Sequence, residues 1–538
     1  MSGSERLLDT AAAAVLAAVA VIAALTFRDY GLGWDDYTHA QYGQMLLDLY
    51  GSGFTDRRAL SFVNLYMYGG GFDMFAALLA KVLPFDLFET RRLAGAIVGL
   101  LGLFVTWRLA RRLGGAVCGL LALLLLATCP FYYGHMFINP KDVPFAVAMV
   151  ILLYGLVRAL QDYPRPGPAT IAAFGAGFGL TIGTRVMGGI AALYVIVPLA
   201  MVIAGDMRRA TAAKAAGNLG RFLLYLLPGF VLAYALMALL WPWSVLEPLN
   251  PVRAVGYFAQ FFEKPWKEMF EGALISVPDM PRSYIPVLFS LKLPEILLAL
   301  SLIGTAWVAN AAFDRTMPMQ GRAALVLIAM AAILPLAIAV ITRPAMYNGI
   351  RHFAFVMPPL AVLGGLGGAW LLDCLVRRSR AAGVAAAVVI LIGLSLPVLA
   401  MVRLHPYQYT HFNWLSGGIK HADNRYMLDY WGLAFKQASQ ELRARLTERL
   451  EVPTRRRRWR IAVCGPHPAA EVELGPEFVA TWDTRGADFA MMLGEFYCAE
   501  LDAPVLVEIA RDGVVFARVY DIRGRNISDM FTIPPVTR

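Results

Sequence analysis

Residues 10–27 read TAAAAVLAAVAVIAALTF, an apolar run that approaches the roughly 20 residues needed to cross a bilayer as a helix. A comparable run covers residues 113–127. Of the 538 residues, 58% are hydrophobic and 16% are charged, whereas soluble domains carry roughly 25% charged residues. We therefore expect a polytopic α-helical membrane protein. The six residues at the start lack a strongly basic lead and an obvious cleavage site, so the first run is predicted to be a retained helix.

The hydrophobic pattern predicts about eleven transmembrane helices. They lie near residues 8–27, 92–110, 113–129, 143–160, 168–183, 189–204, 220–241, 295–312, 322–341, 353–373 and 381–402. The segment 69–82 is apolar but short, and it contains Asp73 and Lys81. We interpret it as an interfacial or re-entrant segment, since a full span needs about 20 residues.

Basic residues support this count through the positive-inside rule. With the N-terminus inside and eleven spans, the cytoplasmic loops receive most of the arginines, whereas a span at 69–82 would put the same residues outside. These loops hold Arg108, Arg111, Arg112, Arg158, Arg165, Arg208, Arg209, Lys214, Arg221, Arg315, Arg322, Arg377, Arg378 and Arg380. They account for much of the net charge of +10, so no nucleic-acid partner is expected.

This topology divides the chain into two domains. Residues 1–403 form the transmembrane domain, with long external loops at 28–91 and 242–294. Residues 404–538 are more polar and contain an amphipathic helical pattern at 430–450, with strand patterns at 460–463, 505–509 and 514–520. We expect a small extracytoplasmic α/β domain there. Its two cysteines, Cys464 and Cys498, could form a disulfide if the tail lies outside the cytoplasm.

Acidic residues mark the outer ends of two predicted spans. Asp35 and Asp36 stand side by side in the sequence GWDDYTH, residues 33–39. Such a pair suits a general base, because one ionised carboxylate raises the pKa of its neighbour. The alternative is a helix N-cap for residues 37–49, and both interpretations can hold together. Asp142 offers the same choice: it is either an N-cap or a second carboxylate for the acceptor or a metal.

Several basic and aromatic residues on the outer side depart from the positive-inside pattern. They are Lys141, Arg185, Arg343, Tyr347 and Arg351. Because guanidinium groups bind phosphate through paired hydrogen bonds, a phosphate ligand outside the cytoplasm would explain them. The alternative is contact with lipid headgroups or a solvated rim.

Three histidines lie near these residues: His39, His135 and His352. They are candidate substrate or metal contacts, although a lone histidine at an interface is more often a hydrogen-bonded polar residue. No metal site is firmly predicted, and a requirement for a divalent cation such as Mg²⁺ or Mn²⁺ stays open.

Taken together, these features resemble the GT-C integral-membrane glycosyltransferases, near the family 39-like branch of protein O-mannosyltransferases and aminoarabinose transferases. The resemblance covers roughly residues 10–403 and depends on the order and sidedness of its motifs. These are the acidic pair, Asp142, the Gly-flanked Arg185, and the run that contains Tyr347, Arg351, His352, Phe353, Pro358 and Pro359.

The resemblance implies that a sugar moves from a polyprenyl-phosphate donor to an acceptor hydroxyl or phosphate, with inversion, at the periplasmic face of a bacterial inner membrane. It implies that Asp35 is the base, Asp36 its partner and Asp142 a supporting carboxylate, while Arg185 and Arg351 hold the lipid phosphate. Many relatives have Asp-Glu at the pair, which leaves the choice of base open. The acceptor could be a lipid, a polysaccharide or a protein.

Two other classes of function compete with this one. A transporter or flippase of a lipid-linked or anionic solute would need ionisable residues in the middle of the membrane and broken helices. A membrane scaffold that binds a partner through its tail would leave the acidic pair and the external arginines without a role.

Overall fold

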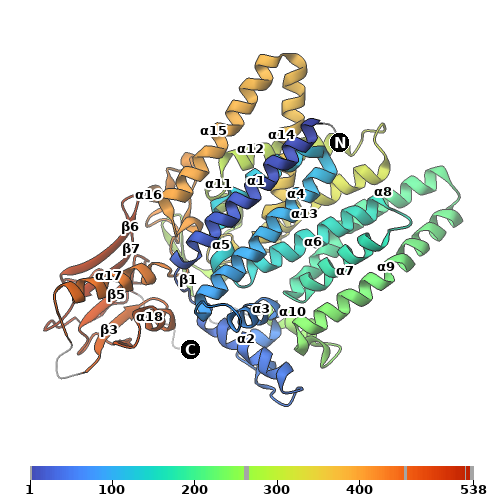
Figure 1. Cartoon of the computed structure of the whole chain (residues 1–538). Helices are drawn as coiled ribbons and strands as arrows, with labels where there is room; N and C mark the ends of the chain where they lie inside the picture. Colours follow the sequence, from blue (N-terminus) through green and yellow to red (C-terminus); the bar gives the residue numbers. More distant parts are fainter. Residues whose placement is uncertain (1–2, 260–265, 453–456, 528, 533–538) are drawn as a thin grey trace.

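The structure is a computed structural model that describes residues 3–259, 266–452, 457–527 and 529–532, and it consists of a helical bundle with a smaller α/β unit at one end (Figure 1). The bundle and its connecting loops contain α1 (Gly3–Thr26), α2 (Asp36–Gly51), α3 (Gly71–Ala80), α4 (Leu87–Ala127), α5 (Pro130–Ile138), α6 (Asp142–Gln161), α7 (Pro168–Ile182), α8 (Ala191–Arg209), α9 (Ala212–Leu240), α10 (Asn250–Ala259), α11 (Tyr284–Lys292), α12 (Glu295–Ala311), α13 (Met319–Thr342), α14 (Met357–Arg378) and α15 (Arg380–Leu404).

Among the described residues, eight helices are long and apolar enough to cross a membrane, or nine if the bent pair α11 and α12 counts as one span. Each of the eleven predicted spans overlaps a helix. The lower number arises partly because α7 has only 15 residues, and partly because α4 contains two predicted spans. The predicted segment 69–82 forms α3, whose 10 residues are too few to cross a bilayer.

Helix α4 folds back on itself at Gly115, which has a φ of +81°. A Cβ atom placed on Gly119 would lie 2.8 Å from the Cβ of Arg111. In a continuous helix these positions would be about 12 Å apart along the axis. The glycine therefore separates the predicted spans 92–110 and 113–129, as the sequence indicates.

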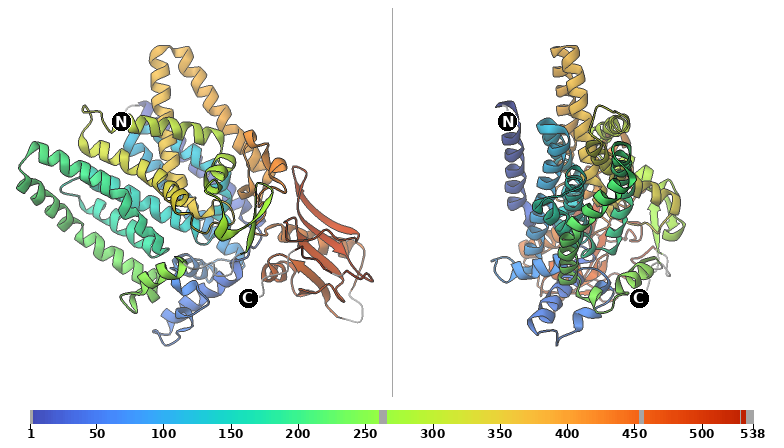
Figure 2. Two further views of the ribbon diagram at one scale, coloured as in Figure 1. Left: turned by 180° about the vertical axis from the view of Figure 1, so that it is seen from behind. Right: turned by 90° about the vertical axis from the view of Figure 1, so that its right-hand side faces the viewer.

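The outer helices of the bundle expose apolar side chains. In the most apolar part of α6, 78% of residues are buried inside the protein, against 17% in α1, α9 and α15. Figure 2 shows α9 and α15 at the edges of the bundle. Their exposed side chains include Leu224, Val231, Val389 and Leu391. Because water would disfavour such surfaces, they are suited to contact with lipid.

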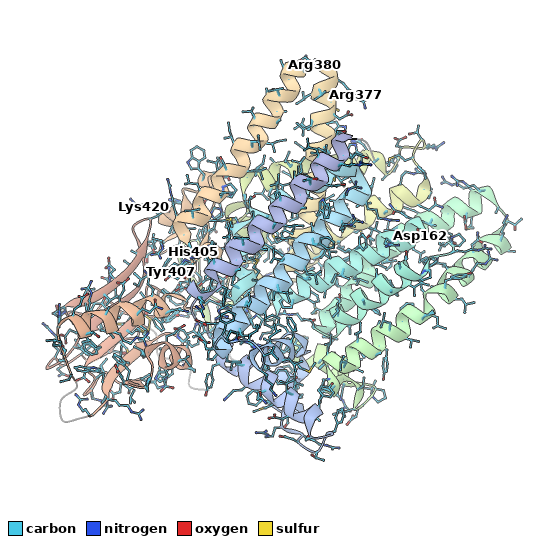
Figure 3. All side chains as sticks on the ribbon, in the orientation of Figure 1. Asp162, Arg377, Arg380, His405, Tyr407 and Lys420 are labelled. Carbon is cyan, nitrogen blue, oxygen red and sulfur yellow. A yellow bond between two sulfur atoms is a disulfide. The ribbon has the colours of Figure 1, made fainter. Side chains whose placement is uncertain are left out.

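The two ends of the bundle differ in composition. Arg377 and Arg380 lie at the tip of the α14–α15 hairpin, whereas His405, Tyr407 and Lys420 lie where α15 meets the tail (Figure 3). The predicted cytoplasmic arginines of this hairpin and the tail are therefore on opposite ends, as the predicted topology requires.

The tail contains a five-stranded mixed sheet with the order β4-β3-β5-β7-β6. Strand β3 is parallel to β4 and β5, while β7 is antiparallel to β5 and β6. The predicted strands are confirmed as β3, β6 and β7, whereas β4 and β5 are additional. The elements of the tail are α16 (Gly418–Ala422), α17 (Ala434–Glu448), β3 (Trp459–Cys464), α18 (His467–Leu474), β4 (Phe478–Thr481), β5 (Phe489–Leu493), β6 (Val505–Arg511) and β7 (Val514–Asp521).

Two further features complete the fold. Cys464 and Cys498 form a disulfide, the pairing that the sequence left open. In the long loop 242–294, strands β1 (Lys267–Phe270) and β2 (Ala273–Ser276) form an antiparallel hairpin. The loop thus brings residues of the bundle and the tail together, because Phe270 also bridges to Tyr426.

Candidate active site

Asp36 is buried and joins the first external loop to the bundle. Arg92 donates through Nη1 to Asp36 Oδ1 (2.9 Å) and through Nη2 to Oδ2 (2.6 Å). The same guanidinium donates to the carbonyls of Gly31 and Phe137 (2.6 and 3.3 Å), and Gly33 N–H donates to Asp36 Oδ2 (2.8 Å). Because both of its carboxylate oxygens accept hydrogen bonds, Asp36 fixes the first external loop to the bundle.

Asp35 is the accessible member of the pair, because 36% of its side chain is exposed. It occupies the residue before α2, yet its side chain makes no capping hydrogen bond. Its carboxylate lies 3.5 Å from Lys141 Nζ. Burial raises the pKa of Asp35, but nearby positive charges, led by Lys141 and including Arg351, outweigh it and lower the pKa to about 2. Asp35 is therefore ionised at neutral pH.

Asp142 pairs with both arginines that the sequence predicts as phosphate ligands. It is the buried first residue of α6, where Arg185 pairs with Oδ1 and Arg351 Nη1 lies 3.7 Å from Oδ2. Asn139 Nδ2 donates to Oδ2 (2.7 Å), and Asn139 Oδ1 accepts from the Asp142 N–H (2.7 Å). The side-chain acceptor for the backbone N–H groups at the start of α6 is therefore Asn139 rather than Asp142.

Aromatic rings surround these cations. Tyr68 lies beneath Lys141 and Arg185, with ring centroids 5.1 and 5.7 Å from their charged groups. Arg351 lies over Tyr347 (4.7 Å) and over Trp431 (4.9 Å). Rings at these distances stabilise cations through their negative faces. The cation cluster, defined here as Lys141, Arg185 and Arg351, thus contacts two carboxylates, those of Asp35 and Asp142, and three aromatic side chains.

Two residues from other parts of the chain, Trp431 and Glu268, support Arg351, and neither was predicted from the sequence. Trp431 comes from the tail, and its Nε1–H donates to the carbonyl of Ile138 (3.0 Å). Glu268 of β1 is buried and accepts from the Tyr284 hydroxyl (2.7 Å) and from the N–H of Asn348 (2.7 Å), three residues before Arg351. Burial raises the pKa of Glu268.

The predicted histidines have protein partners. His39 Nδ1 lies 2.6 Å from Asp73 Oδ2, His135 Nε2 lies 2.9 Å from the Tyr430 hydroxyl, and the ring of His352 packs 4.9 Å from that of Tyr347. Among the residues that the structure describes, no three His, Cys, Asp or Glu side chains are grouped to hold a metal ion. Asp35, Asp36 and Asp142 are each paired with cations, and a requirement for a divalent cation stays a prediction.

Arg343 is the predicted phosphate ligand that makes other contacts in this structure. It lies at the end of α13 and donates to the carbonyls of Asp279 and Met280 (3.2–3.4 Å), so its role at the phosphate stays a prediction. Its described contacts therefore include none with the cation cluster.

Arg91 and Arg92 were not selected from the sequence, although both are buried at the site. Arg91 Nη2 donates to Asp73 Oδ1 (2.7 Å). The sequence nevertheless contains a pattern that indicates them. Both lie at the outer start of a predicted span, so they depart from the positive-inside rule in the same way as Arg185.

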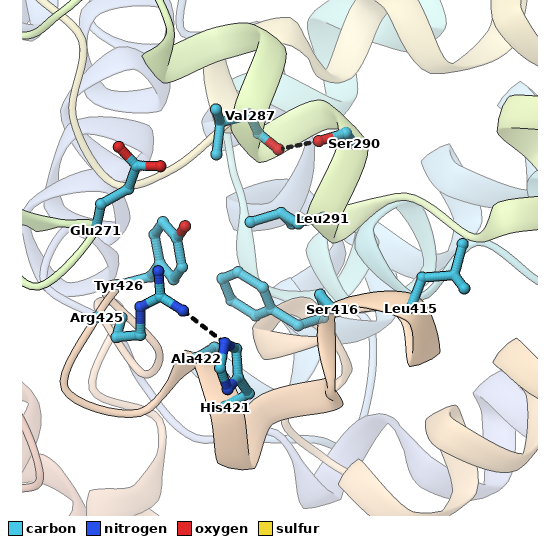
Figure 4. Close-up of a pocket in the computed structure, with 11 residues that line it drawn as sticks. Glu271, Val287, Ser290, Leu291, Leu415, Ser416, His421, Ala422, Arg425 and Tyr426 are labelled. Atoms are coloured by element: carbon cyan, nitrogen blue, oxygen red, sulfur yellow. Dashed lines mark hydrogen bonds between the residues drawn. The ribbon is translucent and has the colours of Figure 1, made fainter.

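A separate cavity of about 310 Å³ lies between α11, the β1–β2 turn and residues 412–426 (Figure 4). Its lining includes Glu271, Arg425 and Phe412, and none of the cation cluster. The Phe412 ring lies 4.3 Å from Lys292 Nζ, which is buried beneath it.

Comparisons with known proteins agree with this architecture. Residues 71–241 match the family described as dolichyl-phosphate-mannose-protein mannosyltransferase. The fold is similar to apo ArnT from Cupriavidus metallidurans, with 17% identity and a TM-score of 0.50 over 95% of this chain and 97% of that one. It is also similar to the apo oligosaccharyltransferase of Archaeoglobus fulgidus, with 13% identity and a TM-score of 0.50 over 89% of this chain and 65% of that one. No curated protein sequence matches the chain.

These matches confirm the resemblance to the GT-C glycosyltransferases that the sequence predicts. The chain has the GT-C fold, and the matched segment contains α3 to α9, including Arg91, Arg92, Lys141, Asp142 and Arg185. The identity to the solved structures is low, so the roles of individual residues depend on the geometry of this site.

Proposed function

We propose that the chain is a membrane glycosyltransferase that moves a sugar from a polyprenyl-phosphate donor to an acceptor hydroxyl or phosphate, with inversion. One observation carries the proposal: an ionised, partly exposed carboxylate, Asp35, lies 3.5 Å from Lys141, a member of the cation cluster. A base beside a phosphate-binding group is the pairing that glycosyl transfer from a lipid phosphate requires. The matched mannosyltransferase family, described by its dolichyl-phosphate donor, supports this donor class.

The cation cluster would bind the donor phosphate. Arg185 and Arg351 are oriented by Asp142 and by the aromatic rings, so their planar groups need little rearrangement on binding. Lys141 supplies a third charge, and it is the cation that pairs with Asp35 in the free protein. A phosphate that attracts Lys141 would weaken this pair and leave the Asp35 carboxylate free to accept a proton.

Asp35 would act as the base. The acceptor hydroxyl gives its proton to Asp35 as its oxygen bonds to the anomeric carbon. The bond from that carbon to the phosphate oxygen breaks, and the electron pair stays on the lipid phosphate, where the cation cluster stabilises the charge. A single displacement inverts the configuration at the anomeric carbon.

Asp36 and Asp142 would act through other groups in this scheme. Asp36 holds the loop that carries Asp35, and Asp142 holds Arg185 and Arg351. We also propose that the site faces the periplasm of a bacterial inner membrane, because the basic hairpin tip at Arg377–Arg380 lies at the other end.

The test is consumption of donor by the purified full chain. A panel of polyprenyl-phosphate sugars, with mannose and aminoarabinose included, is incubated with membrane-lipid, polysaccharide and peptide acceptors. Parallel samples contain Mg²⁺, Mn²⁺ or EDTA. Release of polyprenyl phosphate is measured, and the anomeric configuration of the product is read by NMR.

Asp35→Asn should lower turnover by about 10²- to 10⁴-fold, the usual contribution of a positioned base. Asp56→Asn is the matched control, because Asp56 lies in the same external loop and pairs with exposed Arg58. Failure of the wild-type chain to consume any donor would contradict the proposal, and movement of an intact donor across vesicles would favour a flippase instead.

A further inference from the structure

A buried trio of charged and polar groups lies one helical turn below Asp35 and has no part in the scheme above. His39 Nδ1 is 2.6 Å from Asp73 Oδ2, and Arg91 Nη2 is 2.7 Å from Asp73 Oδ1. All three side chains are buried. Since the charges of Arg91 and Asp73 balance each other, the trio is neutral when His39 is neutral.

The hydrogen bond to Asp73 determines which nitrogen of His39 is available. An ionised carboxylate only accepts hydrogen bonds, so Nδ1 carries the proton that it shares with Asp73. In a neutral imidazole the other nitrogen, Nε2, then has a free lone pair. It is buried and has no hydrogen-bond partner among the described residues, which is a costly arrangement for a group without a role.

Helix register directs His39 toward Asp35. The N–H of His39 donates to the carbonyl of Asp35 (3.0 Å), and Asp35 has helical backbone angles, so the two residues are related as i and i+4 on one face. Side chains on a helix lean toward its N-terminus. The imidazole therefore lies on the face of α2 that carries Asp35.

The trio is tightly built. A Cβ atom on Gly43, one turn after His39, would lie 2.4 Å from the backbone oxygen of Asp73, so only glycine allows α3 to approach α2 this closely. Two other charged groups on elements that contact α2 have partners outside the trio: Glu473 of α18 accepts from the N–H of Leu32, and Arg58 pairs with Asp48.

We propose that His39, positioned by Asp73 and Arg91, receives the proton that Asp35 takes from the acceptor hydroxyl. The inference rests on the proposed function. After transfer, the Asp35 carboxylic acid gives its proton to Nε2, which restores the Asp35 carboxylate and forms an imidazolium. Asp73 keeps the hydrogen bond to Nδ1 and stabilises the new charge. The proton returns to water when the products leave, so the cycle needs no other reagent.

His39 is a positioning and relay residue in this account, because it acts through Asp35 and touches no reacting atom. The test uses His39→Gln and His39→Ala in the full chain, with the donor that the wild type consumes. Glutamine can still donate to Asp73 but cannot take up a proton. His421→Gln is the matched control, since His421 is an exposed histidine of the tail that contacts Arg425 (2.5 Å).

We expect His39→Gln to lower kcat by about 10²-fold, with little change in KM for the donor and in the thermal unfolding temperature. Added imidazoles should restore activity to His39→Ala, and the restored rate should rise with the basicity of the imidazole. That dependence separates proton transfer from packing, because filling a space does not depend on basicity.

Three results would overturn the inference. The first is wild-type kcat in His39→Gln while Asp35→Asn is inactive, which leaves the proposed function intact. The second is rescue of His39→Ala that does not depend on basicity, and the third is the absence of rescue in a folded His39→Ala protein. A wild-type chain that consumes no donor would instead contradict the proposed function itself.

Discussion

The two ends of the helical bundle contain the same types of charged residue, but the Arg–Asp pairs differ in how far they are buried. At the end away from the tail, the Arg377–Asp373 pair is exposed, with 78% and 57% of the two side chains accessible. At the tail end, Arg92–Asp36 and Arg91–Asp73 are buried almost completely. Exposed pairs contribute about 0–1 kcal/mol, whereas buried pairs require compensation for lost hydration.

The difference in burial of the ion pairs distinguishes the tail end of the bundle from the opposite end. A buried charge persists only when several partners stabilise it, and Arg92 has three, from the first external loop and α5. Such a concentration of charge at one end indicates a functional site. Asp35 stands out from Asp36, Asp73 and Asp142, because those three are buried and Asp35 is partly exposed.

The largest expected difference between the ends concerns stability. Asp36→Asn removes one charge and leaves Arg92 buried without its carboxylate, so we expect a loss of about 3–5 kcal/mol in the free energy of unfolding. Denaturant unfolding in detergent measures it. Replacing both partners, as in Asp36→Asn with Arg92→Met, should recover part of the loss. A loss below about 1 kcal/mol in Asp36→Asn would contradict the anchoring role.

Arg351→Lys tests the geometry of the cation cluster. Lysine keeps the charge but loses the planar group that stacks on Tyr347 and Trp431. We expect KM for the donor to rise about 10-fold, which corresponds to about 1.4 kcal/mol. Arg343→Lys is the control, because Arg343 contacts carbonyls of the 279–280 loop instead. Equal effects of the two substitutions would remove Arg351 from the phosphate site.

The pH dependence should differ between the free and the donor-bound protein. The cations near Asp35 lower its pKa to about 2, so kcat/KM should show no loss from Asp35 above about pH 4. A bound phosphate neutralises those cations and raises the pKa toward the ordinary value of about 3.9 or higher. The acidic limb of kcat should therefore lie at higher pH than that of kcat/KM. Coincident limbs would show that the phosphate does not reach the cluster.

The smallest effect is expected at the opposite end. Asp9→Asn breaks a partly exposed pair with Arg111, so the loss in the free energy of unfolding should be about 1 kcal/mol or less. Donor turnover should be unchanged. A large loss of turnover would mean that the two ends are coupled. It would contradict the conclusion that only the charged residues at the tail end take part in the reaction.

Much of the fold could be predicted from the sequence, because the bilayer imposes length and composition on each span. The spans, the break near Gly115 and the short α3 follow from local patterns. Strands β4 and β5 do not, since Phe489–Leu493 is a short, fully buried run without alternation. Such a run cannot be distinguished from part of a helix.

The site was predicted in part. Four residues were selected because their loops are predicted to lie outside the cytoplasm, and the structure brings them together: Asp35, Asp142, Arg185 and Arg351. This criterion could not distinguish Asp35 from Asp36, because the two acids are adjacent in sequence. Only the structure shows that Arg92 pairs with Asp36.

Trp431 and Glu268 were missed for another reason. Trp431 lies about 80 residues beyond Arg351 in the chain, and Glu268 lies about 80 before it, so only tertiary packing brings either close. No local pattern distinguishes them from other residues of the tail and of the long loop.

The most direct test of the central claim is a structure of the full chain with bound polyprenyl phosphate, determined in lipid nanodiscs. We predict that the phosphate oxygens lie within hydrogen-bond distance of Arg351 and of Arg185 or Lys141, with Lys141 drawn away from Asp35 and the Asp35 carboxylate open to the acceptor. A phosphate bound at the Arg377 end of the bundle, or at any site that leaves the cation cluster paired as it is in the free protein, would contradict the account.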